Sequence, residues 1–173
     1  MSDALAAQLP TSPEALLARL ADLDISVSSF SHPPVHTVEE AKALRGELAG
    51  GHIKNLFLRN KKGAMWLITC LEDRKIDLKA LGQALGAGRF SFGSAERLMT
   101  YLGVRPGAVT PFAVINDTED KVQVVLDAGV FDCDPVNAHP LVNDRTVAVS
   151  PADLVRFLES VGHPPQILDF GSL

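Results

Sequence analysis

Cysteine is scarce in this chain, and long apolar runs are missing. Its 173 residues include two cysteines, Cys70 and Cys133, which are too few for a disulfide scaffold. The longest apolar runs, such as residues 64–68, fall far short of the roughly 20 residues that cross a bilayer. The first ten residues contain one Asp and no Lys or Arg, unlike a signal peptide. These absences predict a protein of the reducing cytoplasm that does not span a membrane.

Basic residues are outnumbered by acidic ones. The chain has 16 Lys and Arg against 21 Asp and Glu, which gives a formal net charge of −5. This balance argues against a protein that coats nucleic acid non-specifically, but it leaves room for a local basic patch that touches one RNA end. The composition is 46% hydrophobic and 21% charged, which is ordinary for a globular protein. We therefore expect one domain spanning residues 1–173.

The pattern of caps and apolar positions predicts an α+β fold. Apolar stripes with helical spacing follow a capping box at residues 11–14, with Pro13 in the first turn, and four further capping residues, Thr37, Asp77, Ser94 and Ser150. Apolar runs typical of strands occur at residues 25–30, 53–59, 64–71, 112–116, 122–126 and 146–149. The second and third of these runs flank a short polar turn, so they should form a hairpin. Because strand pairs and helices do not alternate strictly, we expect a largely antiparallel sheet with helices packed on it, and residues 132–143 as a loop.

The common catalytic and metal-binding motifs are missing from the sequence. It has no G-x-S-x-G, no G-x-x-x-x-G-K-[ST] and no H-E-x-x-H. Residues 86–88 begin a G-x-G without the strand and helix of a dinucleotide site, so the end of a helix followed by a loop is favoured there. His32 and His36 have H-x-x-x-H spacing, but Pro33 and Pro34 between them prevent the helix that zinc binding at this spacing needs. We expect no metal and no cofactor.

Neither cysteine has the surroundings of a nucleophile. Cys70 ends an apolar strand and is expected to be a small core residue. Cys133 lies between Asp132 and Asp134, whose negative charges should raise the pKa of its thiol. A thiol hydrolase that uses Cys133 with His139 stays open as an alternative function.

Three polar features are candidates for a functional site. Lys54 interrupts an apolar strand, so its amine must either reach solvent at an edge or meet an anion in a cleft. Gly107 begins a G-x-x-x-P turn that ends at Pro111, and such a turn can present backbone N–H groups to an oxyanion. His139 precedes Pro140 in a polar loop. Each feature taken alone also has an ordinary structural explanation.

Together, in this order and at these spacings, the three features resemble the YbaK/ProX-type editing domain of aminoacyl-tRNA deacylases. The resemblance covers residues 15–160 and is carried by residues 52–58, 86–92 and 107–112. It is strongest toward the branch of freestanding prolyl-tRNA editing proteins that remove alanine from proline tRNA. The resemblance implies an α+β fold with a mixed, largely antiparallel sheet surrounded by helices. It also implies hydrolysis of the ester between a wrong amino acid and the terminal ribose of a tRNA.

The resemblance also implies roles for individual residues. Lys54, Gly107 and His139 match the signature Lys of the family, the Gly of its turn and the His at its pocket mouth, and they are the expected catalytic residues. Asn55 follows the Lys as in the alanine-specific branch, and it is expected to bind substrate together with Ala108. The basic residues expected to contact the acceptor stem are Arg45, Lys75, Arg89 and Arg97.

The implied chemistry needs no covalent nucleophile because the ester is already activated. A positioned water, backbone N–H groups near Gly107 and Ala108, and a cation for the adjacent phosphate suffice. The expected partners are the acceptor end of mischarged proline tRNA and prolyl-tRNA synthetase, but neither DNA nor a membrane. Two further readings remain open, a cysteinyl-tRNA(Pro) deacylase of the same family and a non-catalytic module that binds tRNA or a synthetase.

Overall fold

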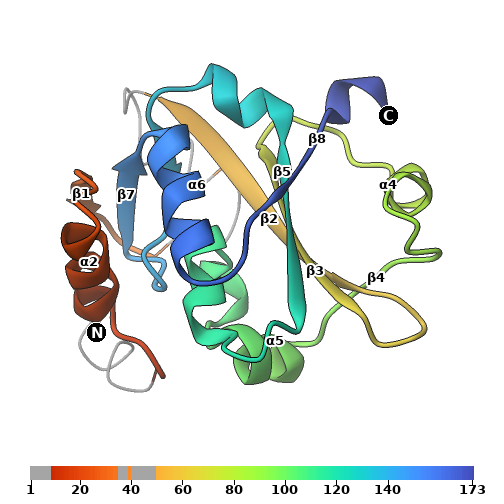
Figure 1. Ribbon diagram of the computed structural model, residues 1–173, viewed down its shortest axis with the longest axis horizontal. Helices are drawn as coiled ribbons and strands as arrows, with labels where there is room; N and C mark the ends of the chain where they lie inside the picture. The colour runs from red at the N-terminus through yellow and green to blue at the C-terminus, as the bar shows by residue number, and fades with distance from the viewer. Residues whose placement is uncertain (1–8, 35–38, 40–49) are drawn as a thin grey trace.

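A computed structural model describes residues 9–34, 39 and 50–173, and its strands form one mixed sheet (Figure 1). The helix expected after Thr37, with Arg45 in it, lies outside the described residues. The strands are β1 (Ser28–Ser31), β2 (Gly51–Arg59), β3 (Met65–Leu71), β4 (Ser91–Phe92), β5 (Val122–Asp127), β6 (Val136–Ala138), β7 (Arg145–Val149) and β8 (Gln166–Leu168).

The strand order is β1-β7-β6-β2-β3-β5-β8, and β4 pairs with β2 off this path. The β1–β7, β6–β7, β2–β3 and β2–β4 pairs are antiparallel. The β2–β6, β3–β5 and β5–β8 pairs are parallel. The expected mixed sheet is therefore confirmed, as is the β2–β3 hairpin at its centre.

Three of the four described α-helices begin at the expected capping residue, and the first of the four begins within the expected capping box, with Ser12 as its cap. The helices are α2 (Pro13–Asp22), α4 (Leu78–Ala84), α5 (Ala95–Leu102) and α6 (Pro151–Ser160). Their first turns donate backbone N–H groups to the side chains of Ser12, Asp77, Ser94 and Ser150. A capping oxygen satisfies N–H groups that have no partner inside the helix, so it fixes where the helix starts. In the part of the chain that the structure describes, no helix is long and apolar enough to cross a membrane.

The sheet has an apolar core on each face. Alternate residues of β2 and β3, including Phe57 and Leu67, pack in one core with α2, α5 and α6. The residues between them, including Leu58 and Ile68, pack in a second core with Leu81 of α4. Figure 1 shows α5 and α6 over the middle of the sheet, with α2 and α4 toward its opposite ends. Side chains of consecutive strand residues therefore lie on opposite faces of the sheet and contact different cores, and the same holds for the site residues on these strands.

Three expectations about secondary structure were wrong or incomplete. Residues 112–116 form part of a 3-10 helix, η2 (Pro111–Asn116), rather than a strand. Pro111 presets the backbone for a helical start, and the Thr110 hydroxyl accepts a hydrogen bond from the amide of Phe112 at 3.4 Å. The loop expected at residues 132–143 contains β6, and the C-terminal tail contributes β8. Both of these strands have only three residues, which is too short for an alternating pattern to be recognised.

Candidate active site

Asn55 joins the centre of the sheet to the G-x-x-x-P turn. Its side-chain amide donates to the Val109 carbonyl at 3.1 Å, and its side-chain oxygen accepts from the Thr69 hydroxyl at 2.6 Å. Thr69 lies opposite Asn55 in the β2–β3 register and is fully buried. Because both ends of the Asn55 amide are bonded, the turn is held at a fixed position above the sheet.

The turn itself leaves one of its two expected oxyanion donors available. Residues Pro106–Ala108 form the short 3-10 helix η1, in which the Ala108 amide donates to the Arg105 carbonyl at 2.9 Å. Ala108 is also buried, whereas Gly107 is exposed. Within the described ranges, no hydrogen-bond acceptor faces the Gly107 amide. Gly107 thus remains a candidate donor, while the amide of Ala108 is committed to the turn.

Lys54 follows the other face of β2. Its amine donates to the backbone carbonyl of Arg74, in the turn after β3. Cys70 lies opposite Lys54 in the register, and burial raises the pKa of its thiol to about 11. Cys70 is therefore a protonated core residue, as expected, and Lys54 is anchored by a neutral carbonyl.

A buried carboxylate fixes the turn that holds Lys54. Asp127 has no exposed surface, and it accepts hydrogen bonds from Nε of Arg74 at 2.9 Å and from the amides of Leu71 and Gly129 at 3.2 and 3.0 Å. Burial alone would raise the pKa of Asp127, but the hydrogen bonds from Arg74, Gly129 and Leu71 outweigh it and lower that pKa. The same contact raises the pKa of the Arg74 guanidinium, so both partners stay charged.

His139 lies just beyond β6, the strand next to β2. Its Nδ1 is 2.8 Å from the Arg145 carbonyl, which only accepts hydrogen bonds, so Nδ1 carries a proton. Burial lowers the pKa of His139 and favours the neutral ring, whose Nε2 then has a free lone pair. The His32 ring lies 6.1 Å away and bonds the Thr146 hydroxyl through Nε2 at 2.8 Å. His139 is therefore an acceptor next to a second imidazole.

The structure joins some of the expected site residues directly and others only through the sheet. Asn55 contacts the turn that carries Gly107 and Ala108. Across residues 9–34, 39 and 50–173, no hydrogen bond or ion pair links Lys54, Gly107 and His139 to one another. Thr69 and Asp127 were missed by the sequence analysis, although a Thr inside the apolar run of β3 was a visible signal.

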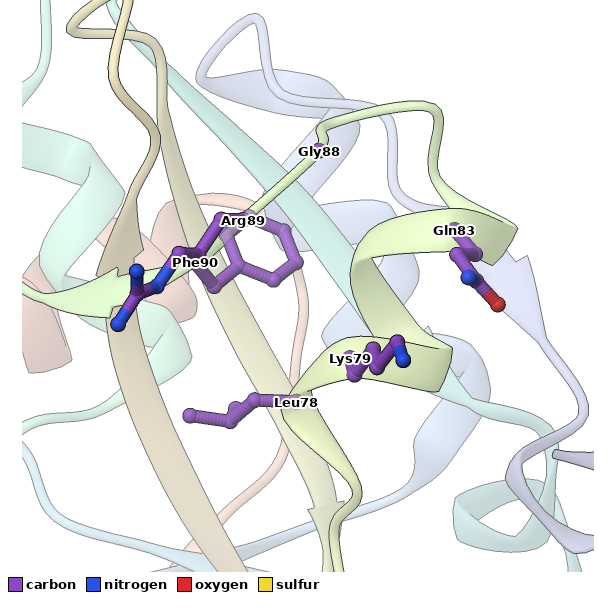
Figure 2. Close-up of a pocket in the computed structure, with 6 residues that line it drawn as sticks. All are labelled: Leu78, Lys79, Gln83, Gly88, Arg89 and Phe90. Atoms are coloured by element: carbon purple, nitrogen blue, oxygen red, sulfur yellow. The ribbon is translucent and has the colours of Figure 1, made fainter.

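The three described basic residues that were expected to bind tRNA lie on different elements within residues 59–97. Lys75 is exposed in the turn before α4, and Arg97 is half-buried on α5. Arg89 is exposed at a hollow of about 480 Å³ between α4 and residues 88–90 (Figure 2). This hollow is lined by Leu78, Lys79, Gln83, Gly88, Arg89 and Phe90.

Cys133 lacks the surroundings of a nucleophile. Its Sγ lies 3.8 Å from the Gly129 carbonyl, and burial, with the charge of Asp132 as the next cause, raises the pKa of the thiol. The sulfur packs so closely on Gly51 that a Cβ there would lie 2.3 Å from it. These contacts favour a packing role over the thiol-hydrolase alternative.

One group of side chains could in principle offer metal ligands. Ligand atoms of Asp117, Asp120 and His163 lie within 4.8 Å of one another. Asp117 already accepts hydrogen bonds from His163 Nε2 at 2.9 Å and from the amides of Lys121 and Val122 at 3.0 and 2.7 Å. A cation would have to compete with these bonds, so the group serves as a structural tie between the start of β5 and the end of α6.

The model of the family described as the aminoacyl-tRNA editing domain matches residues 32–157, a span that includes Lys54, the turn at Gly107 and His139. The chain belongs to this family. The resemblance seen in the sequence is thereby confirmed, and the described fold is that of an editing domain.

Proteins similar to this editing domain carry names from prolyl-tRNA metabolism. The prolyl-tRNA editing protein ProX of Acetoanaerobium sticklandii is 38% identical over 151 residues, covering 87% of this chain and 92% of that protein. The prolyl-tRNA synthetase associated domain-containing protein 1 of Bos taurus is 40% identical over 161 residues, covering 90% and 94%. A crystal structure of a candidate trans-editing enzyme for prolyl tRNA synthetase shares the fold, with a TM-score of 0.64, 20% identity, and coverage of 83% and 85%.

Proposed function

We propose that this editing domain is a trans-acting deacylase that removes mischarged alanine from proline tRNA. A relative named as a prolyl-tRNA editing protein, matched over 92% of its length, supports proline tRNA as the carrier of the ester. The observation that carries the chemistry is the amide of exposed Gly107, which has no hydrogen-bond partner among the described residues and lies on a turn that Asn55 fixes to the sheet. A fixed N–H group without a partner is what a developing oxyanion needs, because no reorganisation is required during the reaction.

In the proposed reaction, a water molecule attacks the ester carbonyl, and the bond to the ribose oxygen breaks. The products are free alanine and tRNA with an unesterified terminal ribose. Gly107 donates to the oxygen that becomes negative, and the neutral Nε2 of His139 accepts a hydrogen bond from the substrate amino group or from the water. The amine of Lys54 leaves the Arg74 carbonyl for a phosphate of the tRNA end. That exchange replaces a neutral acceptor with a charged one and is therefore favourable.

The proposed selectivity is steric. Alanine presents only a methyl group, so the pocket cannot recognise it by hydrogen bonds to the side chain. It can reject proline, because forcing a larger group into a packed site typically costs about 1–3 kcal/mol and can also displace the attacking water. A synthetase pocket built for proline cannot make the complementary distinction, since missing methylenes are worth only about 1–3 kcal/mol each.

The test is a panel of proline tRNA charged with Ala, Cys, Ser or Pro, with the initial rate of amino-acid release measured for each. We expect rapid release of alanine and none of proline above the rate without enzyme. Faster release of cysteine than of alanine would assign the protein to the cysteine-specific branch. Equal release of all four would refute the size sieve. Tight binding of the charged tRNA without any release would favour the non-catalytic module.

We also propose the acceptor end of proline tRNA and prolyl-tRNA synthetase as partners. The association with the synthetase rests on the names of relatives such as the Bos taurus protein. A physical advantage of this association is that it would bring the editing domain close to newly charged tRNA as the synthetase releases it. Co-sedimentation of the two proteins with and without tRNA tests this association.

A further inference from the structure

Positive charge is concentrated in one part of this acidic protein. Residues 59–97 hold eight of the 16 Lys and Arg residues but only four of the 21 Asp and Glu residues. The segment is therefore net positive in a chain whose net charge is −5. It covers the β2–β3 turn, α4, the connector at residues 86–90 and β4.

The cations of this segment are largely unneutralised. Outside the segment two arginines are paired, Arg145 with Glu14 at 2.8 Å and Arg156 with Asp153 at 2.9 Å, and inside it Arg74 is paired with Asp127 at 2.9 Å. Among the described residues, five exposed cations of the segment take part in no ion pair, namely Lys61, Lys62, Lys75, Lys79 and Arg89. Exposed cations without acidic neighbours create a positive potential that attracts a polyanion.

Hydrogen bonds hold the parts of this surface together. The Asn60 side-chain amide donates to the Ala87 carbonyl at 3.0 Å, and its oxygen accepts from the Lys62 amide at 3.1 Å. The β2–β3 turn and the connector are thus one unit. The connector also lies directly on α4, since a Cβ at Gly82 would come within 2.1 Å of the Gly88 carbonyl oxygen. The elements that carry the cations are therefore held in fixed positions relative to one another.

Aromatic groups accompany the cations. Figure 2 shows the hollow with Lys79 and Gln83 on α4 at one side and Arg89 and Phe90 on the connector at the other. Phe92, two residues after Phe90, pairs with Leu58 at the sheet edge and is 62% exposed. An exposed ring beside unpaired cations is the arrangement that stacks a base while the cations contact phosphates.

We propose that this basic face, formed by Lys61, Lys62, Lys79, Arg89 and Phe92, binds the unpaired 3′ strand of an RNA acceptor end. The cations contact backbone phosphates, and one base stacks on Phe92 or enters the hollow. The proposal rests on the proposed function only in taking tRNA as the source of the RNA. It agrees with the position of Lys54, which lies on the same face of β2 as Leu58, four residues or about 13 Å away along the strand.

The experiment measures binding of uncharged RNA, so that its outcome is independent of catalysis. The probe is a fluorescent acceptor minihelix of proline tRNA with its single-stranded 3′ end, titrated by anisotropy at several salt concentrations. We expect the Lys79→Ala/Arg89→Ala double variant to bind about 10-fold more weakly, with a shallower salt dependence because two phosphate contacts are lost. Phe92→Ala should weaken binding about 10-fold with an unchanged salt slope, since stacking involves no counterion release. Lys121→Ala, an exposed cation outside the segment, is the matched control and should stay within twofold of the wild type.

Several results would overturn the proposal. The first is wild-type affinity in both the double variant and Phe92→Ala. Another is equal binding of a blunt minihelix without the 3′ overhang, which would exclude the single strand as the ligand. A third is a result in which the double variant and Phe92→Ala no longer bind prolyl-tRNA synthetase but keep wild-type affinity for the RNA. This face would then be a protein interface. Failure of the proposed function looks different, because the wild type would bind the minihelix through this face yet release no alanine from the charged tRNA.

Discussion

Lys54 and Asn55 are neighbours in β2, yet their side chains are bonded on opposite faces of the sheet. The Lys54 amine reaches the Arg74 carbonyl in the turn after β3, while Asn55 reaches the Val109 carbonyl in the turn after α5. One dipeptide thus ties the central strand to two separate loops. Substitutions at the two positions should have separable effects.

Replacing Asn55 should damage the turn more than the fold. Asn55→Ala removes the bond to Val109, so the Gly107 amide loses its fixed position, and we expect kcat/KM for alanine release to fall at least 10-fold. The loss of stability should be about 1–2 kcal/mol, which is typical for a partly buried hydrogen bond. Initial rates and urea unfolding check both values. Thr69→Val is the matched control, because it removes the other hydrogen bond of Asn55 and leaves the Val109 contact in place. Equal losses of kcat/KM in Asn55→Ala and Thr69→Val would show that the hydrogen bond to Val109 has no particular role in catalysis.

Lys54→Ala should leave the fold intact and remove most deacylation. Its only bond in the described chain is to a backbone carbonyl that solvent can replace, whereas loss of its phosphate contact would misplace the ester. Lys54→Arg, which keeps the charge, should retain part of the activity. The measurements are thermal unfolding and single-turnover rates. Near-normal turnover in folded Lys54→Ala protein would exclude Lys54 from the site.

Asp127→Asn should make stability less dependent on acid pH. The pKa of Asp127 is lower in the folded protein than the roughly 3.9 of an unfolded Asp, so its charge stabilises the fold above that pH. This contribution is lost as the pH falls through the folded value. We therefore expect the variant to be about 2 kcal/mol less stable at pH 7 and the difference from wild type to shrink toward pH 3. Urea unfolding at several pH values measures this, with exposed Asp132→Asn as the control. If the difference in free energy of unfolding between wild type and Asp127→Asn does not change with pH, the shape of the Asp127 side chain matters and its charge does not.

The two amide replacements of His139 should behave differently. His139→Asn can still donate to the Arg145 carbonyl, whereas His139→Gln places an oxygen near the position of Nε2. If Nε2 is the atom that meets the substrate, the Gln variant keeps more activity than the Asn variant. In the wild type, kcat/KM should decline only below pH 6.5, since burial lowers the pKa of His139. A decline that begins above that pH would contradict the neutral-acceptor role.

Gly107→Val should be far more harmful than Cys133→Ser. Gly107 lies in a 3-10 helix and is exposed, so the expected damage is steric, from a branched side chain that blocks approach of the ester to the amide. Cys133 bonds only weakly to Gly129, so its replacement by Ser should change the rate less than twofold. Rates on alanyl-tRNA(Pro) for both variants decide the matter. An inactive Cys133→Ser beside an active Gly107→Val would restore the thiol hydrolase.

The sequence predicts the local parts of this fold well and the long-range parts poorly. Helix starts follow from capping side chains one to three residues away, and the β2–β3 hairpin follows from its turn. Residues 112–116 were mistaken for a strand because the apolar run was weighed more heavily than Thr110 and Pro111, which start a helical turn. Strands β6 and β8 acquire their structure only by pairing with β2, β7 and β5.

The site shows the same division. Lys54, Gly107 and His139 stand out in the sequence as polar features, but their catalytic roles come from a family resemblance that none of the three supplies alone. The Asn55–Val109 bond joins residues 54 positions apart, and the Arg74–Asp127 pair joins residues 53 positions apart. Such contacts depend on which elements are neighbours in the fold, and local patterns in the sequence do not predict those neighbours. The commitment of the Ala108 amide to Arg105 likewise depends on the exact dihedral angles of the turn.

The strand order has a consequence for how the protein is made. Ser28 of β1 pairs with Ala148 of β7, Gly51 of β2 with Val136 of β6, and Met65 of β3 with Val122 of β5. A chain emerging from the ribosome can therefore form the β2–β3 hairpin early, but it cannot complete the sheet until β7 and then β8 have been synthesised. Contacts so distant in sequence also slow folding, because large loops must close before they are formed. We expect the nascent chain to keep its central apolar strands exposed through most of translation and to depend on rapid completion of synthesis to bury them.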